Sequence, residues 1–322
     1  MIEIVVKTEN EERHVRVSAE ELGALVRRIG GDDDRFLVVQ RIPDLPDVFA
    51  QVWHEAGGDG GDGEGDGEGD GDGDGNYTLE YRDGAADRHF QATVDGPEAV
   101  ISALAGWARQ EPGWDDGPAW SLLDMGAVRE VPPLDLDEEE REELEEHVRE
   151  VLIGGYSSRS ELAELAEDYL VTGDHRPVSP EQAEALVDRL WLERVAEQAG
   201  WEGETDPERL TRAFTALEEA GITARENFTC CGSCGQSEIE DEGGPDARGY
   251  VYFHTQCTDS AAAGHGLMLF YGGFDDSSET TVAVGHEVVA ALEAAGLHTE
   301  WDGDPGRAIT VTRLDWRRRL VG

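Results

Sequence analysis

The chain has 322 residues, enough for two ordinary domains that each bury a core without disulfide support. Its formal net charge is −46 at pH 7, from 72 acidic and 26 basic side chains. A field of this sign repels phosphate backbones and anionic lipid, so it argues against nucleic acid and a membrane surface as partners and favours a basic protein.

The first residues, MIEIVVKTENEERHV, carry charges from Glu3 onward, and no stretch approaches eighteen consecutive apolar residues. We therefore expect a soluble, cytoplasmic protein. In that reducing compartment, the 4 cysteines are expected to be free, metal-bound or catalytic, and not to form structural disulfides.

The first part of the chain predicts a small α/β sandwich domain over residues 1–130. Alternating apolar residues predict an opening strand hairpin, and the capping box of Ser18 and Glu21 begins a helix that Gly30 ends. A second helix begins at Pro97. Further strands are predicted at FLVVQRI, DVFAQVWHE, NYTLEYRDG and HFQATV.

Residues 57–75, GGDGGDGEGDGEGDGDGDG, contain no apolar side chain. The segment cannot offset its ordering entropy by burial, so it is predicted to be a disordered acidic loop between two strands. Asp70, Asp72 and Asp74 match the first half of an EF-hand loop, but Tyr81 stands where a bidentate Glu is needed. We expect weak gathering of divalent cations there, and no specific calcium site.

The paired prolines of VREVPPLDL predict a linker at residues 131–135 and a second domain at 136–322. About four helices come first, beginning with the acid-rich run DEEEREELEEHVREVLI. From Ile222 onward the pattern changes to strands: ITARENF, GYVYFHTQ, HGLMLFYGG, LHTEW and RAITVTRL, with a helix before LHTEW. The predicted fold class is α+β, with the helices leading into a mixed sheet that has a crossover helix.

The stretch TCCGSCGQ, residues 229–236, carries the chemistry of the chain. Cys231 and Cys234 form CxxC followed by Gly235, the arrangement of a zinc knuckle, and His254 with Cys257 forms HxxC. These four residues predict a metal site with zinc as the ion.

Two features count against that set. HTQC directly follows the strand YVYF, so His254 and Cys257 converge only if the chain turns at Thr255–Gln256, and Cys230 adds a competing thiol. A redox thiol pair and reduced cysteines that stabilise a turn are the alternatives.

The runs ITARENFTCCGSCGQSEI, GYVYFHTQCTDSA, GLMLFYGGF and VVAALEAAGLHTEWDGDPGRAITVTRLDWRRRL together resemble an uncharacterised bacterial family of actinomycete type, classed as a domain of unknown function. The resemblance covers residues 136–322, and its specific pieces are the CCxxCG turn, the HxQ strand end and the WDGDPG turn. The family has no assigned activity, so the resemblance implies a domain boundary and no reaction. Residues 1–128 are weakly similar to small α/β immunity proteins of bacterial toxin systems.

Three functional hypotheses follow. The first is a non-enzymatic interaction or regulatory protein with a structural cysteine turn. The second is a thiol- or metal-dependent enzyme centred on the CxxC and HxxC residues. The third is an immunity-type protein that neutralises a basic toxin by covering it.

Overall fold

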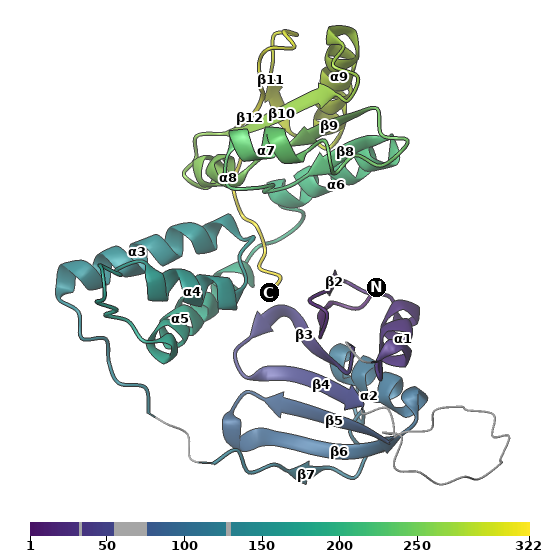
Figure 1. Ribbon diagram of the computed structural model, residues 1–322, viewed down its shortest axis with the longest axis vertical. Coiled ribbons are helices and arrows are strands. Elements are labelled where there is room, and N and C mark those ends of the chain that lie inside the picture. Colours follow the sequence, from purple (N-terminus) through teal and green to yellow (C-terminus); the bar gives the residue numbers. More distant parts are fainter. Residues whose placement is uncertain (32–33, 55–75, 127–129) are drawn as a thin grey trace, which may run out of the picture. The chain divides into compact units, whose positions relative to one another are not determined.

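A computed structural model describes residues 1–31, 34–54, 76–126 and 130–322 (Figure 1). The acidic loop predicted at 57–75 lies outside the described residues, and so do the aspartates that match the first half of an EF-hand loop. The chain divides into two compact units: a first unit of Met1–Pro132 with Leu320–Gly322, and a second unit of Pro133–Arg319. None of the helices in the described part combines the length and apolar composition that a bilayer crossing needs.

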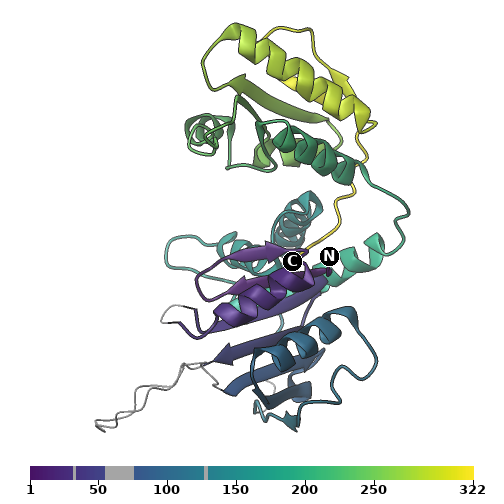
Figure 2. The ribbon, with the colours of Figure 1, turned by 90° about the vertical axis from the view of Figure 1, so that its right-hand side faces the viewer.

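The first unit is an antiparallel sheet with two helices on one face (Figure 2). The described strands run in the order β2-β1-β3-β4-β5-β6-β7. Their bounds are β1 Ile4–Thr8, β2 Arg13–Val15, β3 Phe36–Leu45, β4 Val48–His54, β5 Asn76–Asp83, β6 His89–Asp95 and β7 Ser121–Leu122. The helices are α1 Ala19–Arg28, with the predicted capping box of Ser18 and Glu21, and α2 Pro97–Arg109; a 3-10 turn, η1, spans Ala86–Arg88.

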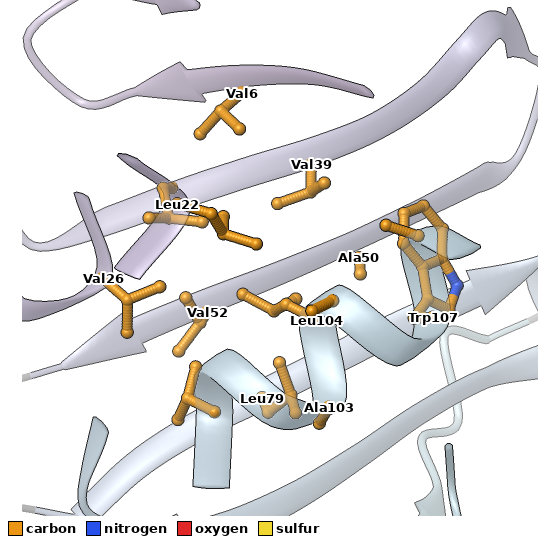
Figure 3. Close-up of a cluster of buried hydrophobic side chains, with 14 of the residues drawn as sticks. Val6, Leu22, Val26, Val39, Ala50, Val52, Leu79, Ala103, Leu104 and Trp107 are labelled. Atoms are coloured by element: carbon orange, nitrogen blue, oxygen red, sulfur yellow. The ribbon is translucent and has the colours of Figure 1, made fainter. Parts of the chain in front are cut away.

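The core of this unit lies between the helices and one face of the sheet (Figure 3). Leu22 and Val26 of α1, with Leu104 and Trp107 of α2, pack on alternate strand residues. Those strand residues are Val6, Val39, Ala50, Val52 and Leu79. Period-two alternation in the strands and period-3.6 spacing in the helices create matching apolar surfaces, which is why the strand predictions here hold.

The other face of the sheet carries a polar array centred on Glu80, a buried residue. Its carboxylate accepts hydrogen bonds from Gln51 Nε2 at 2.6 Å and Gln91 Nε2 at 2.5 Å, and lies 3.1 Å from His89 Nε2. His89 Nδ1 accepts from Arg82 Nε at 3.1 Å. Register explains the array, because Gln51, Glu80 and Gln91 are direct neighbours across β4, β5 and β6.

The second unit begins with the four predicted helices and continues into a mixed sheet, so the α+β prediction is confirmed. The helices are α3 Glu138–Gly154, α4 Arg159–Asp168, α5 Pro180–Gln198 and α6 Asp206–Glu219. The later elements are β8 Ile222–Arg225, α7 Gly232–Glu238, β9 Gly249–Tyr252, α8 Thr255–Ala262, β10 Leu267–Gly273, α9 Ser278–Ala294, β11 His298–Glu300 and β12 Ile309–Thr312.

The described strands of this sheet run in the order β11-β12-β10-β9-β8, with β8 and β9 parallel and the other pairs antiparallel. One face packs against α6 and α9 through Phe214, Leu217, Val288 and Leu292. The connection from β8 to β9 contains the cysteine stretch and α7. The sheet therefore fixes both ends of that connection, and this positions the candidate site.

Candidate functional site

The segment that leads from β8 to the cysteines has an unusual backbone. Asn227 has φ of +50° and Thr229 has φ of +60°, a conformation that a β-branched residue rarely adopts. The surrounding structure holds it: Thr255 N and Oγ1 donate to Thr229 O at 3.1 and 3.0 Å, and Thr258 Oγ1 donates to Asn227 Oδ1 at 2.7 Å. The start of α8 thus fixes the direction in which the chain enters the cysteine turn.

Three of the cysteines lie at the start of α7, with Cys230 directly before its N-cap residue. Cys231 is its N-cap residue in extended conformation, and Cys234 follows inside the helix. Gly235 lies against Tyr252 of β9, where an added Cβ would be 2.5 Å from the ring. The absence of a side chain at this position allows α7 to lie directly on the sheet, as expected for the glycine that follows a CxxC pair.

The sulfur atoms of Cys230, Cys231 and Cys234 all lie within 4.8 Å of one another. Cys230 Sγ is 3.6 Å from Cys234 Sγ, and Cys231 Sγ is 3.2 Å from Ser233 Oγ. All three are free thiols; Cys230 is exposed and the other two are partly exposed. We call these residues the thiol cluster.

Two thiols of the cluster have opposite pKa shifts. Hydrogen bonds from the Ser233 hydroxyl, the Cys234 backbone N–H, and the Cys234 and Cys230 thiols lower the pKa of Cys231 to about 6. The neighbouring Cys230 and Cys231 sulfurs raise the pKa of Cys234 to about 11. At neutral pH, therefore, Cys231 holds the negative charge and the neighbouring thiols donate to it.

His254 and Cys257 form a second, buried pair. Cys257 Sγ lies 3.4 Å from Nε2 and 3.6 Å from Nδ1 of His254. Burial lowers the pKa of His254 and raises the pKa of Cys257, so both groups are neutral near pH 7. A neutral pair of this kind is not an activated nucleophile and base.

The sequence predicted a strand over GYVYFHTQ, residues 249–256, and the end of that strand is wrong. Strand β9 ends at Tyr252 and α8 begins at Thr255, with His254 as its N-cap residue. The chain turns where the predicted convergence required it to turn, and a helix brings positions 254 and 257 onto one side.

The structure places the four predicted metal ligands in two groups. Cys231 and Cys234 are together in the thiol cluster, while His254 contacts Cys257. Between the groups, His254 Nε2 is 3.4 Å from where a Cβ on Gly232 would lie, so the imidazole is beneath the start of α7. The sequence analysis treated Cys230 as a thiol that competes with the predicted metal ligands, whereas in the structure it is a member of the thiol cluster. The adjacent cysteines at 230 and 231 are the sequence signal that could have indicated its membership.

The thiol cluster could hold a metal ion. Thiolates are soft ligands that select Zn²⁺ or Cu⁺, and three sulfurs at this separation supply three positions of a tetrahedral site. Metal binding would replace the sulfur hydrogen bonds, because the ligands must be deprotonated.

A family model described as a domain of unknown function, DUF6891, matches residues 137–320. The comparison with curated proteins found no match, and the comparison with solved structures found none.

Proposed function

We propose, from the premise that this chain belongs to the DUF6891 family of unknown function, that it is a non-enzymatic regulatory protein that binds a soft metal ion, best zinc, through the thiol cluster. One observation carries the proposal: the Cys230, Cys231 and Cys234 sulfurs lie within 4.8 Å of one another at the surface. Exposed sulfurs at this spacing can exchange their hydrogen bonds to one another and to Ser233 for a soft cation, with a large gain in binding free energy.

His254 is the fourth ligand that this proposal favours. Its Nε2 atom lies beneath Gly232, the residue between Cys231 and Ser233. Cys257 is buried against the same imidazole, so in this arrangement it orients His254 and does not bind the ion. The competing ligand set is Cys231, Cys234, His254 and Cys257, in which Cys257 replaces Cys230.

Cobalt titration of metal-free protein separates the two sets. Co²⁺ bound by thiolates absorbs strongly in the near ultraviolet, and Zn²⁺ should displace it. We expect one Co²⁺ per chain, and affinity weakened about a hundredfold or more in Cys231→Ser and Cys230→Ser. Cys257→Ser is the matched control and should bind nearly as well as the wild type. If Cys257→Ser loses the metal and Cys230→Ser keeps it, the competing set is correct. If the wild type binds no Co²⁺, both sets are refuted.

The second candidate function is thiol–disulfide exchange, favoured by the 3.6 Å separation of the Cys230 and Cys234 sulfurs. Glutathione disulfide would be the oxidant: two protein thiols lose two electrons and two protons, one S–S bond forms, and two glutathione thiols are released. A mass decrease of two hydrogens confined to 230–234, with no metal bound, would favour this function over the first.

The partner in this proposal is a basic protein. The net charge of −46 supports steering of such a partner and disfavours nucleic acid. A cytoplasmic location fits cysteines that are free. A basic toxin is one partner of this kind, as the immunity-like pattern of residues 1–128 suggests.

A further inference from the structure

Strand β6 is only partly paired on the outer side of the first unit's sheet (Figure 1). Its outer neighbour β7 pairs with it as far as Gln91, and in the described chain the ladder stops there although β6 continues. If the register continued, Ala119 would be the next residue to exchange hydrogen bonds with β6. The chain turns away instead, with Trp120 N donating to Pro118 O at 3.1 Å. Residues 93–95 therefore form an open edge of the sheet.

The backbone groups of Thr93 point out of this open edge. In an antiparallel ladder the N–H and C=O of one residue point to the same side, and that side alternates along the strand. His89 O accepts from Leu123 N at 2.8 Å and Gln91 O accepts from Ser121 Oγ at 3.2 Å, so the odd-numbered residues of β6 face away from β5. The register with β5 is continuous to the end of β6, and no described residue pairs with Thr93 on the outer side. Thr93 thus offers one donor and one acceptor to an added strand.

A groove of about 590 Å³ lies beside the open edge and is lined by it. One wall consists of small residues of α2, among them Ala99, Ser102 and Gly106. The other wall is the loop after α2, which is held in place because Trp114 packs on Gly106, where an added Cβ would lie 2.8 Å from the Trp114 Cβ. Trp114 also contacts Tyr81 edge to face, with ring centroids 4.9 Å apart. The groove is formed before a partner arrives, which lowers the cost of binding.

The charged groups of the groove define the partner. Asp95 and Glu111 line it, and no basic residue is among its described lining. Asp95 is exposed and pairs with no basic residue of the described chain, while Glu111 lies 3.6 Å from Arg109. Both carboxylates attract a Lys or Arg side chain. A second copy of this chain is disfavoured as the occupant, because it would bring another net charge of −46 to the same edge.

We infer that the open edge of β6 is the docking site for an extended segment of a basic protein, which adds a strand to the sheet where β7 stops. Hydrogen bonds with the backbone of Thr93 fix the register of the added strand. Alternate side chains lie along the small residues of α2, and a Lys or Arg reaches Asp95 or Glu111. The inference rests on the proposed basic partner for the charge of the segment, and it is independent of the metal site.

The test is a titration of the full chain with the peptide acetyl-KVRVKVRV-amide, followed by calorimetry and by amide hydrogen exchange in NMR. We expect the peptide to bind and to slow the exchange of the Thr93 N–H. Thr93→Pro removes that donor and should weaken binding about tenfold, whereas Thr93→Val keeps it and should bind like the wild type. Ser102→Trp should abolish binding, because the indole fills the groove.

Further variants separate docking at this edge from general attraction to an acidic chain. Asp95→Asn should weaken binding about threefold at low salt. Asp87→Asn is the matched control, because it removes the same charge from the exposed η1 turn at the other end of β6. Proline is tolerated in an edge strand where its nitrogen faces outward, and circular dichroism shows whether each variant is folded. Ser102→Trp decides the outcome if Thr93→Pro is not folded.

The inference is overturned if the peptide does not bind. It is also overturned if Thr93→Pro and Ser102→Trp bind the peptide as tightly as the wild type, which would keep a basic partner but place it elsewhere. A dimer in light scattering that Ser102→Trp converts to a monomer would assign the edge to a second copy of this chain and overturn it as well. Cys231→Ser should leave peptide affinity unchanged, so this test and the cobalt titration fail independently.

Discussion

The polar array around Glu80 and the thiol cluster differ in the burial of their ionisable groups and in the hydrogen-bond partners of those groups. Glu80 is buried, and its carboxylate accepts from Gln51 and Gln91 and faces His89, whose other ring nitrogen accepts from Arg82. The thiols of the cluster are partly or fully exposed and contact mainly one another and Ser233. A buried charge with its hydrogen bonds satisfied stabilises the fold, whereas exposed thiols that converge on one another can exchange their sulfur hydrogen bonds for a metal ion.

The largest effect that tests this comparison is the difference in thiol reactivity. At pH 7 in the presence of a chelator, iodoacetamide should modify Cys231 on the order of a hundredfold faster than Cys257. Cys231 has a pKa of about 6, whereas burial raises the pKa of Cys257 and shields its sulfur. Peptide mass spectrometry after short exposures measures both rates. The Cys231 rate should rise with a midpoint near pH 6, and equal labelling of the two residues would break the comparison.

Removing the centre of the polar array should be the largest stability effect. Glu80→Ala leaves the half-buried amides of Gln51 and Gln91 and the buried His89 without their acceptor, which should cost about 2–4 kcal/mol of unfolding free energy. Glu98→Ala is the control: that carboxylate is exposed and pairs with an exposed Arg27, so the change should cost about 0.5 kcal/mol or less. Urea denaturation of each variant gives both values. Similar costs for the two would mean that the array is not structural.

The contact between α7 and the sheet can be tested at its glycine. Gly235→Ala should destabilise the second unit by about 1–3 kcal/mol, because the new Cβ would overlap the Tyr252 ring. Gly244→Ala has nothing within 4 Å of its Cβ and should change stability by about 0.5 kcal/mol or less. Thermal melting followed by circular dichroism compares them. A neutral Gly235→Ala would show that α7 does not need this close approach.

The sequence predicted the longer strands and the longer helices because their signals are local. The capping box predicted at Ser18 is present, and α4 and α5 begin with the same local motif at Ser158 and Ser179, each with its partner three residues later. It missed that α8 begins at Thr255. The N-cap residue of α8 is His254, whose side chain makes no capping hydrogen bond. Tertiary packing, and not a local sequence motif, therefore determines where this helix begins.

The candidate site was predictable in part for the same reason. CxxC with a following glycine is a local pattern, and it identified Cys231 and Cys234. The inclusion of Cys230 depends on the left-handed backbone at Thr229, which contacts with Thr255 hold in place.

The smallest effect expected is the acid sensitivity of the polar array. Burial alone would raise the pKa of Glu80, but the hydrogen bonds from Gln91, Gln51 and His89 outweigh it and lower the pKa below the ordinary 4.5. The stability contributed by its ionised form is therefore present above pH 4.5 and lost as the pH falls through the lowered folded pKa. Urea midpoints between pH 6 and pH 3 should fall more steeply for the wild type than for Glu80→Gln. Parallel curves would show that Glu80 does not contribute.

X-ray absorption at the zinc edge tests the central claim most directly. Zinc-loaded protein should show three sulfur neighbours at about 2.3 Å and one nitrogen or oxygen neighbour at about 2.0–2.1 Å. Cys230→Ser should lose one sulfur neighbour, and Cys257→Ser should leave the spectrum unchanged. A coordination shell without sulfur, or a sulfur count that falls in Cys257→Ser and not in Cys230→Ser, would contradict a metal site built on the thiol cluster.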